Sequence, residues 1–496
     1  MFALQLPQLS LLVLSAALWR FLARRIPRLK RPHRGHGTRA HAWGLKLGIA
    51  TGTLAARGHG RAAVAGTPVV LATPDAAQNI LVLGGIGAGK TTGLMQPCLD
   101  QLFEHGSGGL VFDIKGDFHV AVAAVARAHV GMRVVTIGPG HRRFNLLTGL
   151  SPELSASFLK SAILLGGYGA AESFWIDSAT ELLRNTFGVL AAIPECYSLE
   201  GAHAYLFDPR ERERIDSEVL AKAPHLEGRA LRQLRAYQTY HESVFSAFDD
   251  KVAAGIRATA AQVLSPFSHP DLVDAFCRDD PQAPFSMEQV LAPAVAVVDL
   301  PLAAWGLGAK VVYTLLKLRF FNVMQQRPRY ADVDAGRPTF FMCDEYQEVV
   351  SANKDGLSDL NFWDKSRSAG TIGVVSSQSV SSFYAALGNR ELADAILQNF
   401  RQKICFRSED PATLQLVSRI LGRAPRSYVA QTLTLGGHWH GATHYSRARQ
   451  YQEMDAEVAG AQDIRSLAQH EALALLSIDG GSVDDVITTC PLYLDG

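Results

Sequence analysis

The sequence is poor in cysteine, and its six cysteines are scattered along 496 residues. No two of them are separated by only two residues, which is the spacing that zinc ribbons and thiol redox motifs use. Disulfide frameworks belong to small secreted domains that are dense in cysteine, so a framework of this kind is excluded as well. We therefore expect reduced and mostly buried thiols in a cytosolic compartment. The cysteines are Cys98, Cys196, Cys277, Cys343, Cys405 and Cys490.

Acidic residues are absent from the first 74 positions, which hold eleven basic residues. From Asp75 onward acidic residues outnumber basic ones, although the net charge of the whole chain is +1. The main body is therefore not a generally basic nucleic-acid binder, and any contact with DNA there must be local. With 48% hydrophobic and 19% charged residues, the composition is that of a folded α/β protein with two or three domains.

Long apolar stretches are also few, and the clearest one is residues 2–19. A membrane-spanning helix needs roughly 20 residues, so this stretch is at the short end of the range. Arg20, Arg24 and Arg25 follow it, and this order suits an uncleaved anchor with a cytoplasmic basic flank rather than a secretory signal. We expect a single anchor with its flank in residues 1–30; an interfacial helix and a core helix of the body are the alternatives. A single span excludes a multi-span transporter.

Residues 31–65 are rich in Gly, Ala, His and Arg and are predicted to be a linker. Beyond them, short apolar runs alternate with longer helical stretches, which indicates a mostly parallel sheet covered by helices. The runs are apolar without alternation, so we expect strands that are buried on both faces. The expected strands are residues 79–83, 109–113, 133–137, 294–300, 339–343, 371–376, 403–406 and 472–478.

Residues 151–290 break this alternation, because their patterns are helical throughout. We interpret them as an all-helical domain inserted into the α/β domain, whose two parts are residues 66–150 and 291–496. The expected helices of the insertion are residues 153–165, 174–192, 211–220 and 229–264.

A glycine-rich loop stands between an expected strand and an expected helix. The run Gly84-Gly85-Ile86-Gly87-Ala88-Gly89-Lys90-Thr91 fits the pattern G-x-x-x-x-G-K-[ST], and Thr92 opens the helix. Glycines let the backbone amides surround phosphates, and the N-terminus of the helix favours an anion. Lys90 supplies a positive charge to the outer phosphates, and the Thr91 hydroxyl can bind magnesium. We therefore expect residues 84–92 to bind ATP with Mg²⁺.

Two further strands end in polar residues. The apolar run of residues 339–343 is followed by Asp344 and Glu345, the Walker B pattern. Asp344 is expected to hold magnesium, and Glu345 to orient and deprotonate the attacking water. The next strand is followed by Gln378, our candidate sensor of the γ-phosphate; a plain surface amide is the alternative.

Arg367 is predicted to lie on a helix that leads into the Gln378 strand. An arginine there could reach the nucleotide of a neighbouring subunit, and a solvated cation at a helix end is the alternative. Elsewhere, His438, His440 and His444 form a small cluster. No cysteine or carboxylate lies within that cluster, which favours a loop or hairpin over a metal site.

Five further segments, taken in their order along the chain, can be compared with the motifs of a known family. Asp113-Ile114-Lys115-Gly116-Asp117 is by itself a polar turn. The others are Phe144-Asn145-Leu146-Leu147, Phe174-Trp175, Cys343-Asp344-Glu345 with Ser377-Gln378-Ser379, and the stretch of residues 399–407. With the glycine-rich loop, they resemble the type IV coupling proteins of bacterial conjugation and type IV secretion, the TraG/TraD group, over about residues 75–496. The first resembles the Asp-Pro-Lys-Gly-Glu signature of that family, with Ile for Pro and Asp for Glu. The second resembles its Phe-Asn-Pro-Leu segment, without the proline.

The resemblance implies the α/β fold of a RecA-like P-loop NTPase with a mostly parallel central sheet, an all-helical insertion that caps it, and an N-terminal membrane-anchor helix. It implies a homo-hexamer at the bacterial inner membrane, with a cytoplasmic ATPase body that uses ATP and Mg²⁺. Its partners would be single- or double-stranded DNA, a relaxase or other cargo protein, and components of the secretion channel. The sequence departs from the family in having one expected span rather than two, and in ending at Gly496 without a long recruitment tail.

Three functions remain open at this point: a motor that moves DNA, an ATPase that moves only protein effectors, and a nucleotide-gated docking platform with little turnover. Glu345 in the position of a general base argues against the third. Five basic residues of the helical insertion could line the entrance of a pore for DNA, although a solvated helix face is the simpler interpretation of any one of them. They are Arg229, Arg232, Arg235, Lys251 and Arg257.

Overall fold

The computed structural model describes residues 43–165, 173–330, 334, 336–437 and 443–493. The chain divides into two compact units, Met1–Ala42 and Trp43–Gly496, and every described residue belongs to the second. The predicted anchor of residues 1–30 therefore lies outside the described residues, as do His438 and His440. Within the described ranges, no helix is both long and apolar enough to cross a bilayer.

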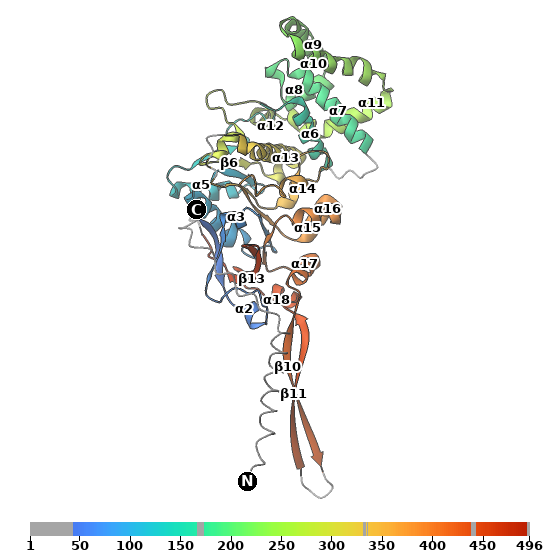
Figure 1. Cartoon of the computed structure of the whole chain (residues 1–496). Coiled ribbons are helices and arrows are strands. Elements are labelled where there is room, and N and C mark those ends of the chain that lie inside the picture. The colour runs from blue at the N-terminus through green and yellow to red at the C-terminus, as the bar shows by residue number, and fades with distance from the viewer. Residues whose placement is uncertain (1–42, 166–172, 331–333, 335, 438–442, 494–496) are drawn as a thin grey trace, which may run out of the picture. The chain divides into compact units, whose positions relative to one another are not determined.

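Eleven strands of the described residues form one large sheet in the order β2-β1-β13-β12-β9-β3-β8-β7-β4-β6-β5 (Figure 1). Every neighbouring pair from β9 to β5 is parallel, and every pair from β2 to β9 is antiparallel. The expected mostly parallel α/β fold is thus confirmed. In chain order the strands are β1 (Gly44–Ala50), β2 (Pro68–Ala72), β3 (Ile80–Leu83), β4 (Gly109–Asp113), β5 (Arg133–Ile137), β6 (Ala294–Asp299), β7 (Thr339–Cys343), β8 (Thr371–Ser377), β9 (Gln402–Phe406), β12 (Glu471–Ile478) and β13 (Gly481–Thr488).

Helices cover both faces of the central strands, so these strands carry apolar residues on both sides. In β3, Leu81 and Leu83 pack into one hydrophobic core, whereas Ile80 and Val82 pack into the other. This division follows from the two-residue period of a strand. The helices outside the insertion are α2 (Thr53–Ala56), α3 (Thr73–Ala76), α4 (Gln96–Glu104), α5 (Phe118–Ala128), α13 (Leu302–Gln326), α14 (Asp359–Phe362), α15 (Val380–Leu387), α16 (Arg390–Leu397), α17 (Pro411–Leu421) and α18 (Ala461–Arg465).

Strand β1 lies within residues 31–65, where the composition predicted a linker. That prediction is wrong for residues 44–50, because β1 pairs with β2 on one side and with β13 on the other. Leu45 and Leu47 are buried and Lys46 between them is exposed, which is the alternation of a strand with one covered face. The sheet therefore begins earlier in the chain than the composition indicated.

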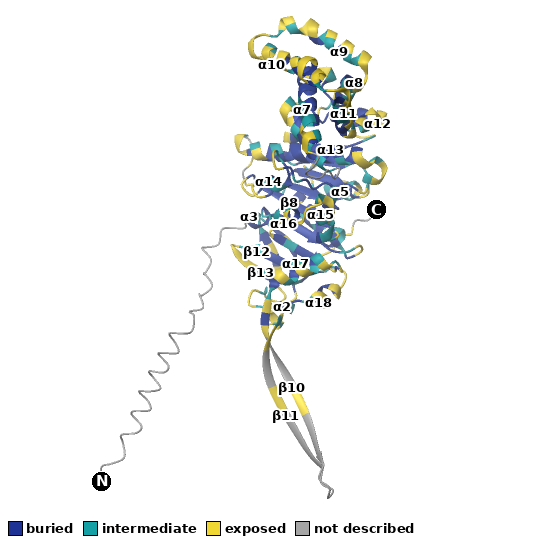
Figure 2. Cartoon of the chain, turned by 90° about the vertical axis from the view of Figure 1, so that its right-hand side faces the viewer, coloured by how far each residue is buried: buried dark blue, intermediate teal, exposed yellow. Residues whose placement is uncertain are grey.

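The part of residues 151–290 that the structure describes contains helices and no strand. The helices are α6 (Pro152–Leu164), α7 (Ser173–Leu190), α8 (Leu199–Phe207), α9 (Pro209–Lys222), α10 (Gly228–Thr239), α11 (Asp250–Leu264) and α12 (Pro270–Phe276). Helix α6 contacts α13, and α9 and α10 present mostly exposed residues (Figure 2). The boundaries of the insertion as a domain stay a prediction.

The single helix expected over residues 229–264 is instead two helices, α10 and α11. Asp249 separates them, because its carboxylate accepts the backbone amides of Lys251 (2.9 Å) and Val252 (3.0 Å) and so starts α11.

Strands β10 (Arg423–Gly437) and β11 (Thr443–Glu457) form a separate antiparallel ribbon. Every residue of β10 has a partner in β11, and the ribbon stands between α17 and α18 in the chain. In both views it extends from the end of the sheet opposite to the helical insertion (Figures 1 and 2).

Candidate nucleotide-binding site

The glycine-rich loop joins the C-terminal end of β3 to the π-helical turn η1 (Thr91–Met95), which continues as α4. Gly87 and Gly89 have φ angles of 71° and 96°, where any other residue would strain the backbone. A Cβ at Gly89 would also lie 2.8 Å from the Nδ1 atom of His470. The loop therefore requires glycine at position 89 for both conformation and space.

Residues near the C-terminus contact the helical turn that follows the loop and the histidine beside Gly89. The amide of Leu492 donates to the carbonyl of Thr92 (3.0 Å), and the Tyr493 hydroxyl lies 2.8 Å from Nε2 of His470. Leu492 and Tyr493 follow the last strand expected from the sequence. No pattern in the sequence predicted that they lie close to the loop.

Lys90 is 8% exposed, and its Nζ donates to the carbonyls of Gly84 (2.7 Å) and Gly85 (3.2 Å). Burial lowers the pKa of Lys90, while the negative charges of Asp344 and Glu345 counteract part of that effect. The ammonium is thus held over the loop that the motif assigns to phosphates.

The structure brings the two predicted magnesium ligands together. The Thr91 hydroxyl donates to Oδ2 of Asp344 over 3.4 Å. The other oxygen of Asp344 accepts from the Ser376 hydroxyl and from the amide of Glu345 (3.0 Å). Ser376 lies in β8, so this carboxylate connects the ends of β3, β7 and β8. A hydroxyl and a carboxylate are hard oxygen ligands and fit magnesium.

Glu345 is 7% exposed and adopts the left-handed conformation, with φ 54° and ψ 45°. Residues other than glycine rarely adopt it, and such strain gathers at functional sites. One carboxylate oxygen accepts from Nε2 of Gln347 (2.7 Å), and Nε2 of Gln378 lies 3.3 Å from both oxygens. Gln378 is therefore beside the predicted base, at the same edge of the sheet.

Lys115 belongs to this site, although the sequence patterns assign it no role and its segment contributes only to the family resemblance. Its Nζ lies 2.8 Å from Oε1 of Glu345 and 3.2 Å from Oδ2 of Asp344, and half of its side chain is exposed. Burial alone would raise the pKa of Glu345, but hydrogen bonds from Lys115 and Gln347, with the charge of Lys115, hold it below its usual value. Conversely, burial would lower the pKa of Lys115, and the two carboxylates raise it. The signal that could have found Lys115 is its place in the segment that resembles the Asp-Pro-Lys-Gly-Glu signature.

The helix predicted around Arg367 is absent, because α14 ends at Phe362 and the next residues form turns. Ser366 and Ser368 donate their hydroxyls to the carbonyls of Trp363 (2.9 Å) and Lys365 (2.7 Å). Such local bonds compete with a helix. The exposed Arg367 therefore precedes β8.

Gln378 follows β8, so Arg367 and Gln378 lie at opposite edges of the sheet. A strand of this length rises by roughly 23 Å. Arg367 is thus far from the Lys90 of its own chain.

A family model for the type IV secretory system, conjugative DNA transfer, matches residues 48–479. The chain belongs to this family. The resemblance to type IV coupling proteins is thereby confirmed, and the match covers most of the part of the chain that the structure describes.

Solved structures of the bacterial conjugative coupling protein TrwB share the fold. The unbound form aligns with a TM-score of 0.60 at 17% identity, over 93% of this chain and 95% of that one. The complex of TrwB with ADP and Mg²⁺ aligns with a TM-score of 0.61 at 16% identity, over 93% and 98%. VirB4 of Thermoanaerobacter pseudethanolicus aligns with a TM-score of 0.50 at 12% identity, over 91% and 98%. A comparison with curated protein sequences finds no match.

In this member of the conjugative DNA transfer family, the basic residues expected at a pore entrance lie on α10 and α11, and all of them are exposed. Arg257 lies over the ring of Phe245, 5.3 Å from its centroid. Of the histidine cluster, only His444 falls on a described element, strand β11. The structure thus leaves the basic residues free to meet a partner from solvent.

Proposed function

We propose that this protein is an ATP-driven coupling protein that recruits DNA, with attached protein, and pumps it into a type IV secretion channel during conjugative transfer. The supporting observation is the convergence of the loop lysine Lys90, the oxygen ligands Thr91 and Asp344, and the buried Glu345 at one edge of the sheet. Membership of the conjugative DNA transfer family supports the cargo and the channel.

Within this proposal, the loop and Lys90 bind the phosphates of ATP, and Thr91 and Asp344 hold magnesium. Magnesium, when bound, neutralises charge that develops on the phosphate oxygens. Glu345 accepts a proton from the attacking water, and its lowered pKa keeps it ionised at neutral pH. Gln378 lies 3.3 Å from that carboxylate, and in this proposal its amide contacts both the base and the γ-phosphate. The TrwB complex with ADP and Mg²⁺ supports the choice of ligands.

Two other functions compete with this one. An ATPase for protein effectors alone would need the same site and is favoured by the excess of acidic residues in the body. A docking platform with little turnover would need binding without hydrolysis, and the orientation of Glu345 by three side chains argues against it.

The proposal is tested by the ATPase rate of the full chain with and without single- and double-stranded DNA, at stated salt concentrations. Stimulation by DNA supports the DNA motor. Basal hydrolysis that DNA does not change supports a protein-effector ATPase, and tight ATP binding without turnover supports the platform. The Lys90→Ala variant should keep the fold and lose hydrolysis; a wild-type rate in the pure variant would contradict the site.

We further propose that the protein works as a homo-hexamer at the bacterial inner membrane, anchored by residues 1–30, with its ATPase body in the cytoplasm. The order of apolar and basic residues at the N-terminus supports the anchor and its orientation, and the family resemblance supports the hexamer. The full chain should fractionate with membranes, and a chain that begins at Ala42 should not. A chain that begins near Ala63, close to the end of the predicted linker, would lack β1 and would therefore disturb the sheet as well as remove the anchor. Full-length protein in the soluble fraction without detergent would contradict the anchor.

A further inference from the structure

Three parallel strands, β4, β6 and β5, end at the edge of the sheet where the nucleotide site lies. Asp113 is the last residue of β4, and Asp299 is the last residue of β6. The two are direct partners in the register of the sheet. His119 lies in the first turn of α5, and His141 follows β5 by four residues. The chain thus brings two carboxylates and two imidazoles to one place from four separate segments.

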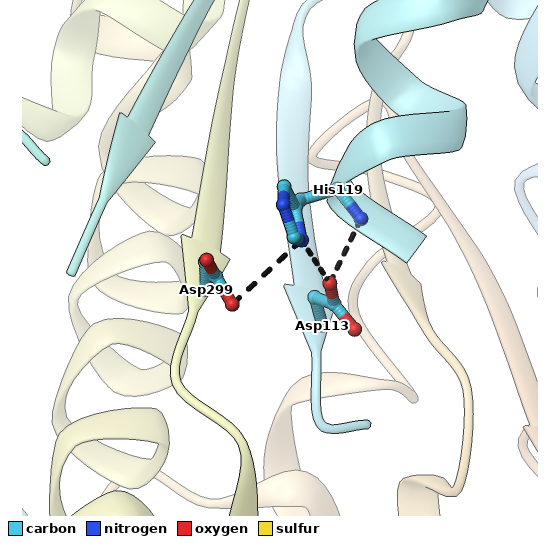
Figure 3. A group of neighbouring side chains, drawn as sticks. All are labelled: Asp113, His119 and Asp299. Carbon is cyan, nitrogen blue, oxygen red and sulfur yellow. Dashed lines mark hydrogen bonds and ion pairs between the residues drawn. The ribbon is translucent and has the colours of Figure 1, made fainter. Parts of the chain in front are cut away.

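The side chains of Asp113, His119 and Asp299 point toward one another (Figure 3). The Nδ1 atom of His119 lies 2.7 Å from Oδ2 of Asp113 and 3.7 Å from Oδ1 of Asp299. One ligand atom from each of these three residues can be chosen so that all lie within 4.8 Å of one another. Nε2 of His141 lies beside this group, 3.2 Å from Oδ2 of Asp299, and a small movement of its ring would make it a fourth ligand.

The two carboxylates of the group lie opposite each other on neighbouring strands. Like charges in this arrangement are unfavourable, and the side chain of Asp113 is 1% exposed and that of Asp299 16% exposed. Among the described residues, the ion-pair partners of these two carboxylates within 4.0 Å are His119 and His141 alone, so no lysine or arginine of the described residues pairs with them. A divalent cation would be attracted to both carboxylates at once.

Asp113 is held rigidly for such a role. Its Oδ1 accepts the amides of Gly116 (2.7 Å) and Asp117 (3.2 Å), and its Oδ2 accepts the amide of His119 (2.8 Å). A carboxylate oxygen has two acceptor positions, so Oδ2 keeps one toward the His119 ring. Ligating carboxylates in metal sites are commonly fixed by hydrogen bonds of this kind.

We propose that Asp113, His119, Asp299 and His141 form a zinc site. With zinc–ligand bonds of about 2.0–2.2 Å, tetrahedral ligands lie about 3.3–3.6 Å apart. The three contacts within the group, at 2.7, 3.2 and 3.7 Å, lie on either side of that range, and the side chains would adjust around the ion to complete the site. Two imidazole nitrogens select zinc over magnesium or calcium, which prefer oxygen ligands alone.

The site would act on the nucleotide site through one turn of the chain. Lys115, which contacts Glu345, lies between the two zinc ligands of this turn, Asp113 and His119. Zinc would fix the turn and hence the position of Lys115. The zinc site is distinct from the magnesium site proposed above, and its test does not depend on ATP hydrolysis.

The test measures zinc binding by the purified full chain, after treatment with a chelator, in competition with a chromophoric chelator. Excess magnesium and the absence of nucleotide keep oxygen-only sites from taking zinc. We expect about one zinc per chain. The His119→Ala/His141→Ala variant should bind zinc at least about 100-fold more weakly, because loss of supporting residues alone commonly weakens a metal site by 10–100-fold.

Matched controls separate this site from other zinc ligands. His129 pairs with Asp100 at 2.7 Å at the end of the same helix α5, so His129→Ala removes a similar pair without touching the group. The replacement of His438, His440 and His444 by alanine removes the other histidine cluster. Both variants should bind zinc like the wild type. Unchanged binding by the His119/His141 variant, or loss in either control, would overturn the proposal.

Cobalt(II) provides a readout that does not need a variant. Bound in place of zinc, it should give the visible absorption of tetrahedral nitrogen and oxygen ligation without a thiolate charge-transfer band. If the double variant does not fold, Asp299→Asn, a substitution of the same size, takes its place, with circular dichroism to establish the fold. A wild-type chain that takes up no zinc, or cobalt bound through thiolate, would show that hydrogen bonds alone hold these four residues together.

Discussion

Lys115 and Glu345 each lie two residues beyond the end of neighbouring parallel strands, and Nζ of the lysine is 2.8 Å from Oε1 of the glutamate. The same ammonium lies 3.2 Å from Asp344. Magnesium and Lys115 would thus share one carboxylate, so the lysine is placed to respond when the phosphates and their metal bind. Its half-exposed side chain leaves it room to move.

Replacing Lys115 should change the pH dependence of hydrolysis. In Lys115→Met, burial still raises the pKa of Glu345 but the lysine no longer lowers it, so this pKa should rise. Glu345 acts as a base only when its carboxylate is ionised, and in the wild type it stays ionised to lower pH than in the variant. The acid limb of kcat against pH should therefore move to higher pH in the variant. Lys310→Met, which removes a lysine 3.2 Å from Glu348, is the control and should leave the limb in place. An unchanged limb in Lys115→Met would mean that Lys115 does not set the ionisation of Glu345.

Glu345→Gln should bind ATP and hydrolyse it at least about 100-fold more slowly, because a general base typically contributes 10²–10⁴-fold. The amide keeps the size of the side chain but cannot accept the proton. Single-turnover hydrolysis and equilibrium binding of ATP separate the two effects. Glu348→Gln, three residues further on, should hydrolyse ATP at the wild-type rate. If Glu345→Gln folded but failed to bind ATP, its role would be in binding rather than in proton transfer.

A buried ion pair near the site should be costly to break. Lys317 and Asp359 are both fully buried, with Nζ and Oδ2 2.5 Å apart. Asp359 also accepts from the hydroxyl of Tyr346, from Nε1 of Trp363 (3.1 Å) and from the amide of Ser351 (2.6 Å). The pair therefore anchors the segment that follows Glu345.

Asp359→Ala would leave the Lys317 ammonium without its partner, and breaking such a pair costs about 3–5 kcal/mol. The free energy of unfolding, measured with urea, should fall by that amount. The double variant Lys317→Met/Asp359→Leu should lose less, since it removes both charges. Asp364→Ala, at an exposed pair 4.0 Å apart, should change stability by less than about 1 kcal/mol. An Asp359→Ala variant as stable as the wild type would contradict this prediction, whereas the loss in the double variant measures the net contribution of the pair.

The buried strands could be predicted from the sequence because both of their faces are covered. The bounds of β4 and β7, buried along their whole length, agree with the apolar runs of residues 109–113 and 339–343. Strand β13 was missed because it contains Asp484 and Asp485, which resemble a loop. Both are buried: Asp485 accepts the amide of Leu54 (2.9 Å), and Asp484 lies 2.9 Å from His59. Their partners come from a segment more than 400 residues earlier, which no local pattern reveals.

The residues of the site also divide into those that a local sequence pattern predicts and those that only the fold brings together. The loop and the Asp344-Glu345 pair could be predicted because each is a local motif with a fixed spacing. The contact of Lys115 with Glu345 could not, because it depends on β4 lying beside β7, and 229 residues separate Lys115 from Asp344. The four residues of the proposed zinc site are scattered for the same reason, and no metal spacing marks them in the sequence.

The last prediction concerns assembly, and it rests on the position of Arg367. This side chain is exposed and precedes β8, whereas Lys90 follows β3 at the opposite edge of the same sheet. Arg367 therefore cannot reach the phosphates of its own chain. An arginine supplied by a neighbour can neutralise charge on the γ-phosphate and contributes about 10³–10⁵ in rate where it operates.

We expect Arg367→Ala and Lys90→Ala each to be inactive alone, and mixtures of the two to regain hydrolysis. In a mixed ring, some interfaces pair a chain with intact Lys90 and a neighbour with intact Arg367, and only an arginine acting between chains can rescue such an interface. Lys365→Ala, an exposed cation of the same turn, should be active alone and serves as the control. Subunit exchange is verified by labelling the two variants differently. If mixed rings form and no ratio restores hydrolysis, Arg367 does not act across the interface, and its exposed position reflects only the turn that it occupies.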